Sequence, residues 1–155
     1  MEASSMSLND LIVRRALETD IPRIYDIEAR SFLEPYSKRL LRFLMLSSPD
    51  TFLVAELDNL VVGYIISTVR YNYLGHILSI AVDENFRRRG IGRLLMLNAE
   101  ERLKHLGCII LRLEVRVSNS AAQNLYLKLG YKKAYVISNY YKNGESAMVM
   151  FKVIG

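Results

Sequence analysis

Residues 82–92 read Val-Asp-Glu-Asn-Phe-Arg-Arg-Arg-Gly-Ile-Gly, and they join a segment with the pattern of a strand to one with the pattern of a helix. Gly90 and Gly92 let backbone N–H groups approach a ligand without a side-chain clash. The helix that begins near Ile91 adds unpaired N–H donors and the positive end of its dipole. The stretch therefore predicts a pyrophosphate site, and the residues expected to form it are Arg87, Arg88, Arg89, Gly90, Ile91, Gly92 and Arg93.

The other interpretation of this stretch is a solvated basic turn at the start of a core helix. A Walker A loop is excluded, because no Gly-Lys-Ser/Thr follows the glycines. A dinucleotide-binding fingerprint is also a poor match, because the third glycine and the ribose-binding acid are missing. Three arginines directly before a helix start favour the anion site over the solvated turn.

The composition is typical of a soluble globular protein of one domain. The chain has 155 residues, of which 51% are hydrophobic and 24% charged, and no repeat or linker divides it. No apolar segment approaches the roughly 20 residues that span a bilayer, and the polar start lacks a signal core. We therefore expect a flexible tail over residues 1–9, a domain over residues 10–155, a cytoplasmic location and no membrane partner.

The single cysteine, Cys108, lies in an apolar run and is expected to be a small core residue. One cysteine excludes an internal disulfide and a cysteine-rich metal site, so no bound metal is expected. The net charge of +5 favours an anionic partner, which nucleic acid, a polyphosphate cofactor or an acidic protein would each satisfy.

Hydrophobic patterns along the chain predict about seven strands and about four helices. Asp20 is expected to cap the first helix, Asp58-Asn59 to form a hairpin turn, and Gly107 and Gly130 to end helices. The order mixes antiparallel hairpins with one strand–helix–strand crossover, which predicts an α/β domain with a mixed, mostly antiparallel sheet. The expected strands are 11–14, 52–56, 60–69, 76–82, 109–117, 131–138 and 146–153, and the helices follow Asp20, Ser37, Gly90 and Asn119.

A second pattern lies downstream, where residues 119–131 read N-S-A-A-Q-N-L-Y-L-K-L-G-Y. Arg87-x-x-Gly90-x-Gly92 resembles the acetyl-CoA motif of the GNAT superfamily, Q/R-x-x-G-x-G/A, and the second run resembles its N-x-x-A-x-x-L-Y-x-x-L-G-F/Y helix. The resemblance extends over nearly the whole chain. It is closest to amino-terminal protein acetyltransferases, both the archaeal alanine/serine type and the bacterial ribosomal-protein type. The other matching stretches are residues 75–77, residues 113–116, Tyr140-Tyr141 and Gly144-Glu145.

This resemblance implies a single GNAT-like domain that uses acetyl-CoA as cosubstrate and transfers the acetyl group directly to an amine. In the family, a backbone N–H on the fourth strand polarises the thioester carbonyl, here that of Val82, and the pantetheine pairs with the same strand at Ile80 and Val82. Tyr126 would be the general acid that reaches the CoA sulfur, and Asn119 a further cofactor contact. A core aromatic is the other interpretation of Tyr126, and both can hold.

Glu114 and His76 are the candidates for accepting the proton of the amine. Along the strand, Arg112, Glu114 and Arg116 share one face, and apolar residues share the other. The pattern alone favours a glutamate paired with flanking arginines on a solvated face, whereas the Leu-Glu-Val-Arg match implies the family's base. His76 resembles the histidine that accompanies this glutamate in archaeal enzymes, although a lone histidine at a strand start is more often structural.

Two loops resemble the walls of the family's peptide groove. The first, residues 32–36, reads Phe-Leu-Glu-Pro-Tyr, so proline and glutamate are exchanged in order relative to the archaeal L-P-E-N-Y. The second, residues 139–142, carries two tyrosines that would hydrogen-bond a peptide backbone or simply cover the sheet. The expected substrate-binding residues are Phe32, Leu33, Glu34, Tyr36, Tyr140 and Tyr141.

The expected substrate is the free N-terminus of a protein or peptide, including ribosomal proteins and nascent chains. The chain is expected to be a monomer or a weak dimer and to require no nucleic acid. Two alternatives stay open. One is acetylation of a lysine side chain or a small amine, and the other is a basic module that binds RNA through Arg87–Arg93. The RNA module explains the charge but not the helix over residues 119–131.

Overall fold

The computed structural model describes residues 10–155, and the predicted tail over residues 1–9 lies outside them. Their helices and strands follow the predicted order and boundaries to within one or two residues. The elements are β1 (Leu11–Arg15), α1 (Ile21–Ser31), α2 (Lys38–Ser47), β2 (Phe52–Leu57), β3 (Leu60–Arg70), β4 (Leu74–Val82), α3 (Ile91–His105), β5 (Ile110–Arg116), α4 (Ser120–Lys128), β6 (Lys132–Ile137) and β7 (Ala147–Val153).

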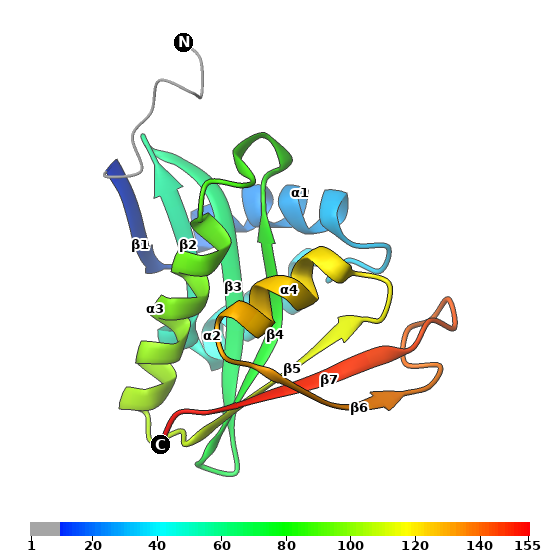
Figure 1. Ribbon diagram of the computed structural model, residues 1–155. Helices are drawn as coiled ribbons and strands as arrows, with labels where there is room; N and C mark the ends of the chain where they lie inside the picture. Colours follow the sequence, from blue (N-terminus) through cyan, green and yellow to red (C-terminus); the bar gives the residue numbers. More distant parts are fainter. Residues whose placement is uncertain (1–9) are drawn as a thin grey trace. The chain divides into compact units, whose positions relative to one another are not determined.

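The strands pair in the order β1-β2-β3-β4-β5-β7-β6, which makes a seven-stranded sheet (Figure 1). β4 pairs with β5 in parallel, whereas β1 with β2, β2 with β3, β5 with β7 and β6 with β7 are antiparallel. The predicted mixed, mostly antiparallel α/β sheet is therefore confirmed. No helix within residues 10–155 has the length and apolar character that crossing a bilayer requires.

Two compact units divide these elements. The first holds the chain up to Ser67 together with Ser79–Arg102, and the second holds Thr68–Leu78 and Leu103–Gly155. β1, β2, α1 and α2 belong to the first unit, and β5, α4, β6 and β7 belong to the second, while β3 and β4 contribute residues to both.

In the first unit, helices pack on opposite faces of β3. A Cβ atom at Gly63 would lie 3.2 Å from the side chain of Leu95 on α3, whereas the hydroxyl of the next residue, Tyr64, hydrogen-bonds Glu28 on α1. Since successive residues of a strand point to opposite faces, α3 covers one face and α1 the other. Strand β2 is accordingly buried along almost its whole length, as expected for a strand that is covered on both faces.

The start of α1 differs from the prediction. Asp20 does occupy the position before the helix, but its carboxylate makes no capping bond to the helix. Instead it accepts hydrogen bonds from the Leu17 N–H at 2.8 Å and from Arg14 at 2.8 and 3.0 Å. The reason is the backbone of Asp20, whose helical φ of −83° and ψ of −17° differ from the extended conformation of a capping residue.

Asp20 is therefore expected to stabilise the fold through Arg14, which gives the first prediction. Burial raises the pKa of Asp20, but the hydrogen bonds from Arg14 and Leu17 outweigh burial and hold it below its usual value. A lowered pKa in the folded state stabilises the protein above about pH 4, and this contribution is lost as the pH falls through the folded-state value. We expect Asp20→Asn to lower the free energy of unfolding by about 1–3 kcal/mol at pH 7.

Urea unfolding at pH 7 and at pH 3 measures this effect, with Asp10→Asn on an exposed residue as the control. The difference between wild type and Asp20→Asn should shrink in acid. An equal difference at both pH values would contradict the role given to the ionised carboxylate.

Candidate active site

A buried carboxylate, Glu114 on β5, is the centre of the polar cluster in the second unit. Its side chain is 9% exposed. His76 Nε2 lies 2.7 Å from one carboxylate oxygen, Oε1, and Arg112 Nε donates to the other, Oε2, at 2.7 Å. The Tyr140 hydroxyl donates a long hydrogen bond to Oε1 at 3.4 Å. The predicted base Glu114 thus contacts another predicted catalytic residue, His76, and a predicted substrate-binding residue, Tyr140.

The sheet register builds this cluster. β4 begins at Leu74, so His76 is the third residue of the strand. The sequence pattern instead predicts a strand that begins at His76. The parallel register pairs His76 with Arg112, and side chains of paired residues lie on the same face of a sheet. The apolar residues of β5, Leu111, Leu113 and Val115, are buried on its other face.

The interpretation of Glu114 as a solvated partner of two flanking arginines holds only in part. Arg112 does pair with it at 2.7 Å, but the Glu114 side chain is only 9% exposed, and Arg116 pairs with Glu145 at 3.0 Å. Burial by itself raises the pKa of Glu114, but the hydrogen bonds from His76 and Arg112 and the positive charge of Arg112 hold it below its usual value. The carboxylate is therefore ionised at neutral pH.

His76 is 8% exposed, and the carboxylate determines which of its nitrogens carries hydrogen. Because an ionised carboxylate only accepts hydrogen bonds, Nε2 is a donor. Nδ1 is buried and has no hydrogen-bond partner among residues 10–155. An imidazole held in this way has a fixed orientation next to the carboxylate, which is the arrangement that proton transfer requires.

The loop between β6 and β7 carries Tyr140 and Tyr141, and it extends beyond the ends of its strands (Figure 1). The two rings meet edge to face with centroids 4.9 Å apart. The guanidinium of Arg116 lies 3.9 Å from the centre of the Tyr141 ring and also holds Glu145 at 3.0 Å. Arg116 therefore fixes the loop that was predicted to bind the substrate.

Tyr126 lies on α4, whose start is capped as predicted, because Asn119 Oδ1 accepts the Ala122 N–H at 3.1 Å. The Tyr126 ring is 7% exposed and packs edge-on against Tyr131. Burial, together with the charge that Tyr141 would carry, raises the pKa of Tyr126 to about 12. The hydroxyl is therefore protonated at neutral pH. The ring position fits the core interpretation, and the hydroxyl's catalytic role stays a prediction.

The predicted phosphate cradle, residues 87–93, belongs to the first unit. Arg88 and Gly90 have positive φ values of 62° and 81°, which turns the backbone sharply before α3. The first intrahelical bond runs from the Leu94 N–H to Gly90 O at 3.0 Å, so the N–H groups of residues 91–93 lack intrahelical acceptors. Such a turn before a helix start presents several donors to an anion.

Asp83 anchors the loop that leads into the cradle. Its carboxylate accepts Arg23 of α1 at 2.5 Å and the Asn85 N–H at 2.8 Å, while its own N–H donates to Val62 O at 2.8 Å. Arg87 Nε donates to Val82 O at 3.0 Å at the end of β4. The path of the cradle loop is thus fixed to α1, β3 and β4.

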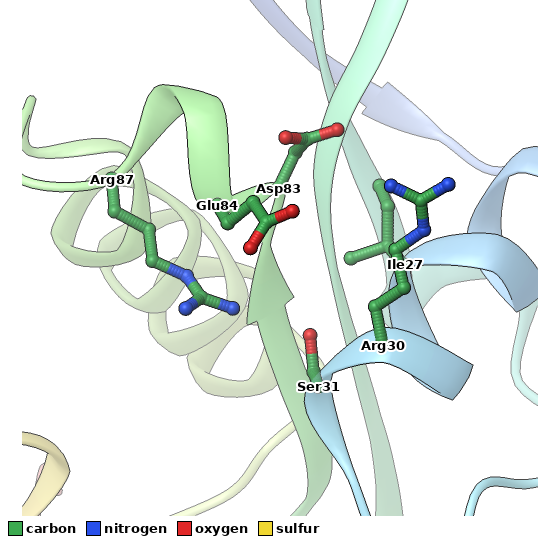
Figure 2. Close-up of a pocket in the computed structure, with 6 residues that line it drawn as sticks. All are labelled: Ile27, Arg30, Ser31, Asp83, Glu84 and Arg87. Atoms are coloured by element: carbon green, nitrogen blue, oxygen red, sulfur yellow. The ribbon is translucent and has the colours of Figure 1, made fainter.

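A small pocket lies between the end of α1 and this loop. Figure 2 shows Arg30 and Arg87 reaching in from opposite sides, with the carboxylates of Asp83 and Glu84 between them. Ile27 and Ser31 complete the lining. Since both signs of charge are balanced here, the pocket has no net preference for an anion.

The predicted substrate loop, residues 32–36, also belongs to the first unit, and Glu28 of α1 holds its end. The Glu28 carboxylate, in a residue that is 2% exposed, accepts the Tyr36 N–H at 2.9 Å. It also accepts the hydroxyls of Ser79 at 3.0 Å and of Tyr64. Leu33, in contrast, is 74% exposed. The loop is therefore anchored at Tyr36 and open to solvent at its middle.

Comparison with known families identifies this arrangement. The model of the Acetyltransferase (GNAT) family matches residues 21–131, from the start of α1 to the residue before β6. The chain belongs to the GNAT acetyltransferase family. This match includes both predicted motifs, the cradle before α3 and the α4 helix.

Known proteins resemble this acetyltransferase over most of its length. An N-alpha-acetyltransferase of Sulfurisphaera tokodaii is 37% identical, covering 89% of this chain and 90% of that protein. A putative ribosomal protein bS18-alanine N-acetyltransferase of Bacillus subtilis is 36% identical, covering 92% and 95%. The crystal structure of Ard1 from Thermoplasma volcanium has a TM-score of 0.91 at 31% identity, covering 94% of this chain and 99% of that one.

Two residues of this GNAT domain were missed as functional candidates from the sequence, Glu28 and Arg112. Glu28 was recognised only as part of the first helix, although an acidic residue on a face shared with Ile21, Ile24 and Ile27 signals a buried polar contact. Arg112 was recognised only as a neighbour of Glu114 on the strand. The cradle and the loop of residues 32–36 lie in the first unit, and the predicted catalytic residues lie in the second.

The Glu28 anchor gives a second prediction. Glu28→Gln replaces a carboxylate that accepts three donors by an amide with one acceptor oxygen, so at least one buried donor loses its partner. We expect the free energy of unfolding to fall by about 1–3 kcal/mol. Urea unfolding measures this loss, and Glu84→Gln, on an exposed side chain, is the control. Equal stability of Glu28→Gln and wild type would show that the carboxylate does not hold the loop.

Proposed function

We propose that this chain transfers the acetyl group of acetyl-CoA directly to the α-amino group of protein N-termini. The observation that carries the proposal is the buried, ionised Glu114 carboxylate, held by His76 and Arg112 beside Tyr140. Relatives that are at least 36% identical and that this chain covers almost completely are named for the same reaction. A base next to a predicted peptide-binding tyrosine is the chemistry that such a transfer requires.

The cradle supports acetyl-CoA as the cosubstrate. Its positive φ values and the unpaired N–H groups at the start of α3 form a concave set of donors that fits a diphosphate. The residues that would hold the cosubstrate are those predicted for it: Ile80 and Val82 on β4, Arg87, Arg88, Arg89, Gly90, Ile91, Gly92 and Arg93 in the cradle, Asn119 directly before α4, and Tyr126 on α4. When bound, acetyl-CoA supplies an activated acyl group.

Glu114 Oε1 accepts a proton from the substrate amine in this proposal, with His76 as its partner. A protein α-amine has a pKa of about 8, so most of it is protonated at neutral pH. It is easier to deprotonate than a lysine side chain, whose pKa is near 10.4. A carboxylate with a lowered pKa is a modest base, and a modest base suits an α-amine better than a lysine.

Tyr126 Oη would be the general acid that protonates the departing CoA sulfur. Its pKa of about 12 keeps the proton on the hydroxyl at neutral pH until the reaction takes it. The Val82 N–H would polarise the acyl carbonyl, as a donor that is oriented before the reaction begins. Phe32, Leu33, Glu34 and Tyr36 would contact the substrate peptide from one loop, and Tyr140 and Tyr141 from the other. Ribosomal proteins and nascent chains in the cytoplasm are the proposed substrates, and the enzyme acts as a monomer or a weak dimer.

A test of this function compares a peptide with a free N-terminus to the same peptide with a blocked N-terminus, together with an internal-lysine peptide and a polyamine. We expect acetyl transfer mainly to the free N-terminus, detected by mass spectrometry. Glu114→Gln and Tyr126→Phe should each lower kcat by about 10²- to 10⁴-fold, because each removes a proton-transfer group. Their affinity for acetyl-CoA should stay within about twofold, because neither removes a phosphate contact.

Tyr73→Phe, on an exposed tyrosine of the same unit, is the matched control and should retain full activity. Preferred acetylation of the polyamine or of the internal lysine would reject the α-amine as the substrate. Full turnover by both Glu114→Gln and Tyr126→Phe would reject the assigned acid and base.

The cradle gives a separate prediction about affinity. Arg88→Gly removes a cationic side chain and at the same time relieves the left-handed backbone, which costs a non-glycine residue about 1 kcal/mol. We expect the Kd for acetyl-CoA to rise by about three- to tenfold, measured by calorimetry. The thermal midpoint of unfolding should stay the same or rise. An unchanged Kd would remove Arg88 from the cradle without affecting the proposal for Glu114.

A further inference from the structure

We infer that Arg112 is a positioning residue for the reaction, which holds the Glu114 carboxylate so that Oε1 faces His76 and Tyr140. The inference rests on the proposed function of Glu114 as the base. It adds a residue to the active site that acts on the substrate only through Glu114.

The guanidinium of Arg112 is fixed from several directions. Its Nε donates to Glu114 Oε2 at 2.7 Å, and its Nη1 donates to the Tyr135 hydroxyl at 3.0 Å. It also lies over two aromatic rings, 5.9 Å from the centre of the Tyr135 ring and 5.7 Å from that of Phe151. A planar guanidinium that stacks and donates in this way has little freedom to turn away from the carboxylate.

The strand register makes this arrangement specific. Phe151 on β7 is the antiparallel partner of Arg112, and His76 on β4 is its parallel partner. Tyr135 on β6 is aligned with Val149, which pairs in turn with Glu114. Four neighbouring strands therefore place the arginine, its aromatic contacts, the histidine and the carboxylate on one face.

The two oxygens of Glu114 have different partners. Arg112 takes Oε2, whereas His76 Nε2 is nearer to Oε1, at 2.7 Å, than to Oε2, at 3.1 Å. The Tyr140 hydroxyl also donates to Oε1. With Oε2 occupied by a cation that cannot lose its proton, Oε1 is the oxygen that accepts one.

The charge of Arg112 also favours the ionised form of Glu114. The titratable and charged groups that act on this carboxylate or on the two tyrosines of the β6–β7 loop are His76 of β4, Arg112 and Arg116 of β5, Tyr140, Tyr141 and Glu145 of the loop itself, and Arg70 of β3. Burial raises the pKa of Glu114, and the bonds from His76 and Arg112 lower it. Without Arg112 the carboxylate stays buried but loses its guanidinium donor and that positive charge, so its pKa rises.

The test is the pH dependence of kcat at saturating peptide and acetyl-CoA. A base must be deprotonated, so a higher pKa moves the acid limb to higher pH. We expect Arg112→Met, which keeps the length of the side chain without its charge, to move this limb up by about one pH unit. Arg112→Lys should move it less, because a lysine keeps the charge but not the planar set of donors. The Kd for acetyl-CoA should not change.

Lys133→Met, which removes one positive charge from an exposed residue of β6, is the matched control and should leave the limb in place. Tyr135→Phe, which keeps the ring but removes the hydroxyl that holds Arg112, should shift the limb in the same direction by a smaller amount. This variant keeps the inference testable if Arg112→Met does not fold.

The double variant Arg112→Met/Glu114→Gln separates this inference from the proposed function. If Arg112 acts through Glu114, the double variant should be no slower than Glu114→Gln alone. The opposite result is a fall in kcat for Arg112→Met that is equal at every pH and that multiplies with the fall for Glu114→Gln. This result would overturn the inference and show that Arg112 has a merely structural role. Full activity of Glu114→Gln would instead overturn the proposed base.

Discussion

The parallel pairing of β4 with β5 is the constraint on which the rest of the active site depends. It aligns His76 with Arg112, two residues from Glu114, so one register places the imidazole and the carboxylate within hydrogen-bond distance. A parallel pair cannot be closed by a tight turn and needs a long crossover connection. In this chain the connection is the cradle followed by α3. The same segment that makes the pairing possible therefore also carries the donors proposed for the cosubstrate.

Two buried carboxylates serve different purposes, and their donors show the difference. Glu28 accepts two hydroxyls and one backbone N–H, and so it connects α1, β3, β4 and the loop of residues 32–36. Glu114 accepts an imidazole, a guanidinium and a long bond from Tyr140. An unpaired carboxylate at such depth would cost several kcal/mol, so both need full partners. Hydroxyl and backbone donors make Glu28 an anchor, whereas the imidazole and the guanidinium keep Glu114 ionised, as the proposed proton transfer requires.

Local sequence patterns predicted the elements well because each rests on contacts within a few residues. The hairpin turn at Asp58-Asn59 is an example, since both residues have the positive φ values that such a turn needs. Arg88 also has a positive φ, which its residue type gives no reason to expect. Asp20 does not cap the helix because its own backbone is helical, and its carboxylate binds Arg14, six residues away, instead. The contacts of Arg112 and Glu28 depend on strand register and tertiary packing, which no local pattern contains.

The hydrogen-bond donors around Glu114 explain why the pKa values of Glu114 and Tyr126 are shifted in opposite directions. Burial raises the pKa of both Glu114 and Tyr126. The hydrogen bonds from His76 and Arg112 reverse this effect at Glu114, whereas Arg116 pairs with Glu145 and lies over the ring of Tyr141. Tyr126 therefore keeps its proton and Glu114 loses its own. Two titratable groups whose pKa values are driven apart in this way can act as acid and base at the same pH. In the proposed reaction, this difference between the surroundings of the carboxylate and those of the phenol sets the direction in which protons move.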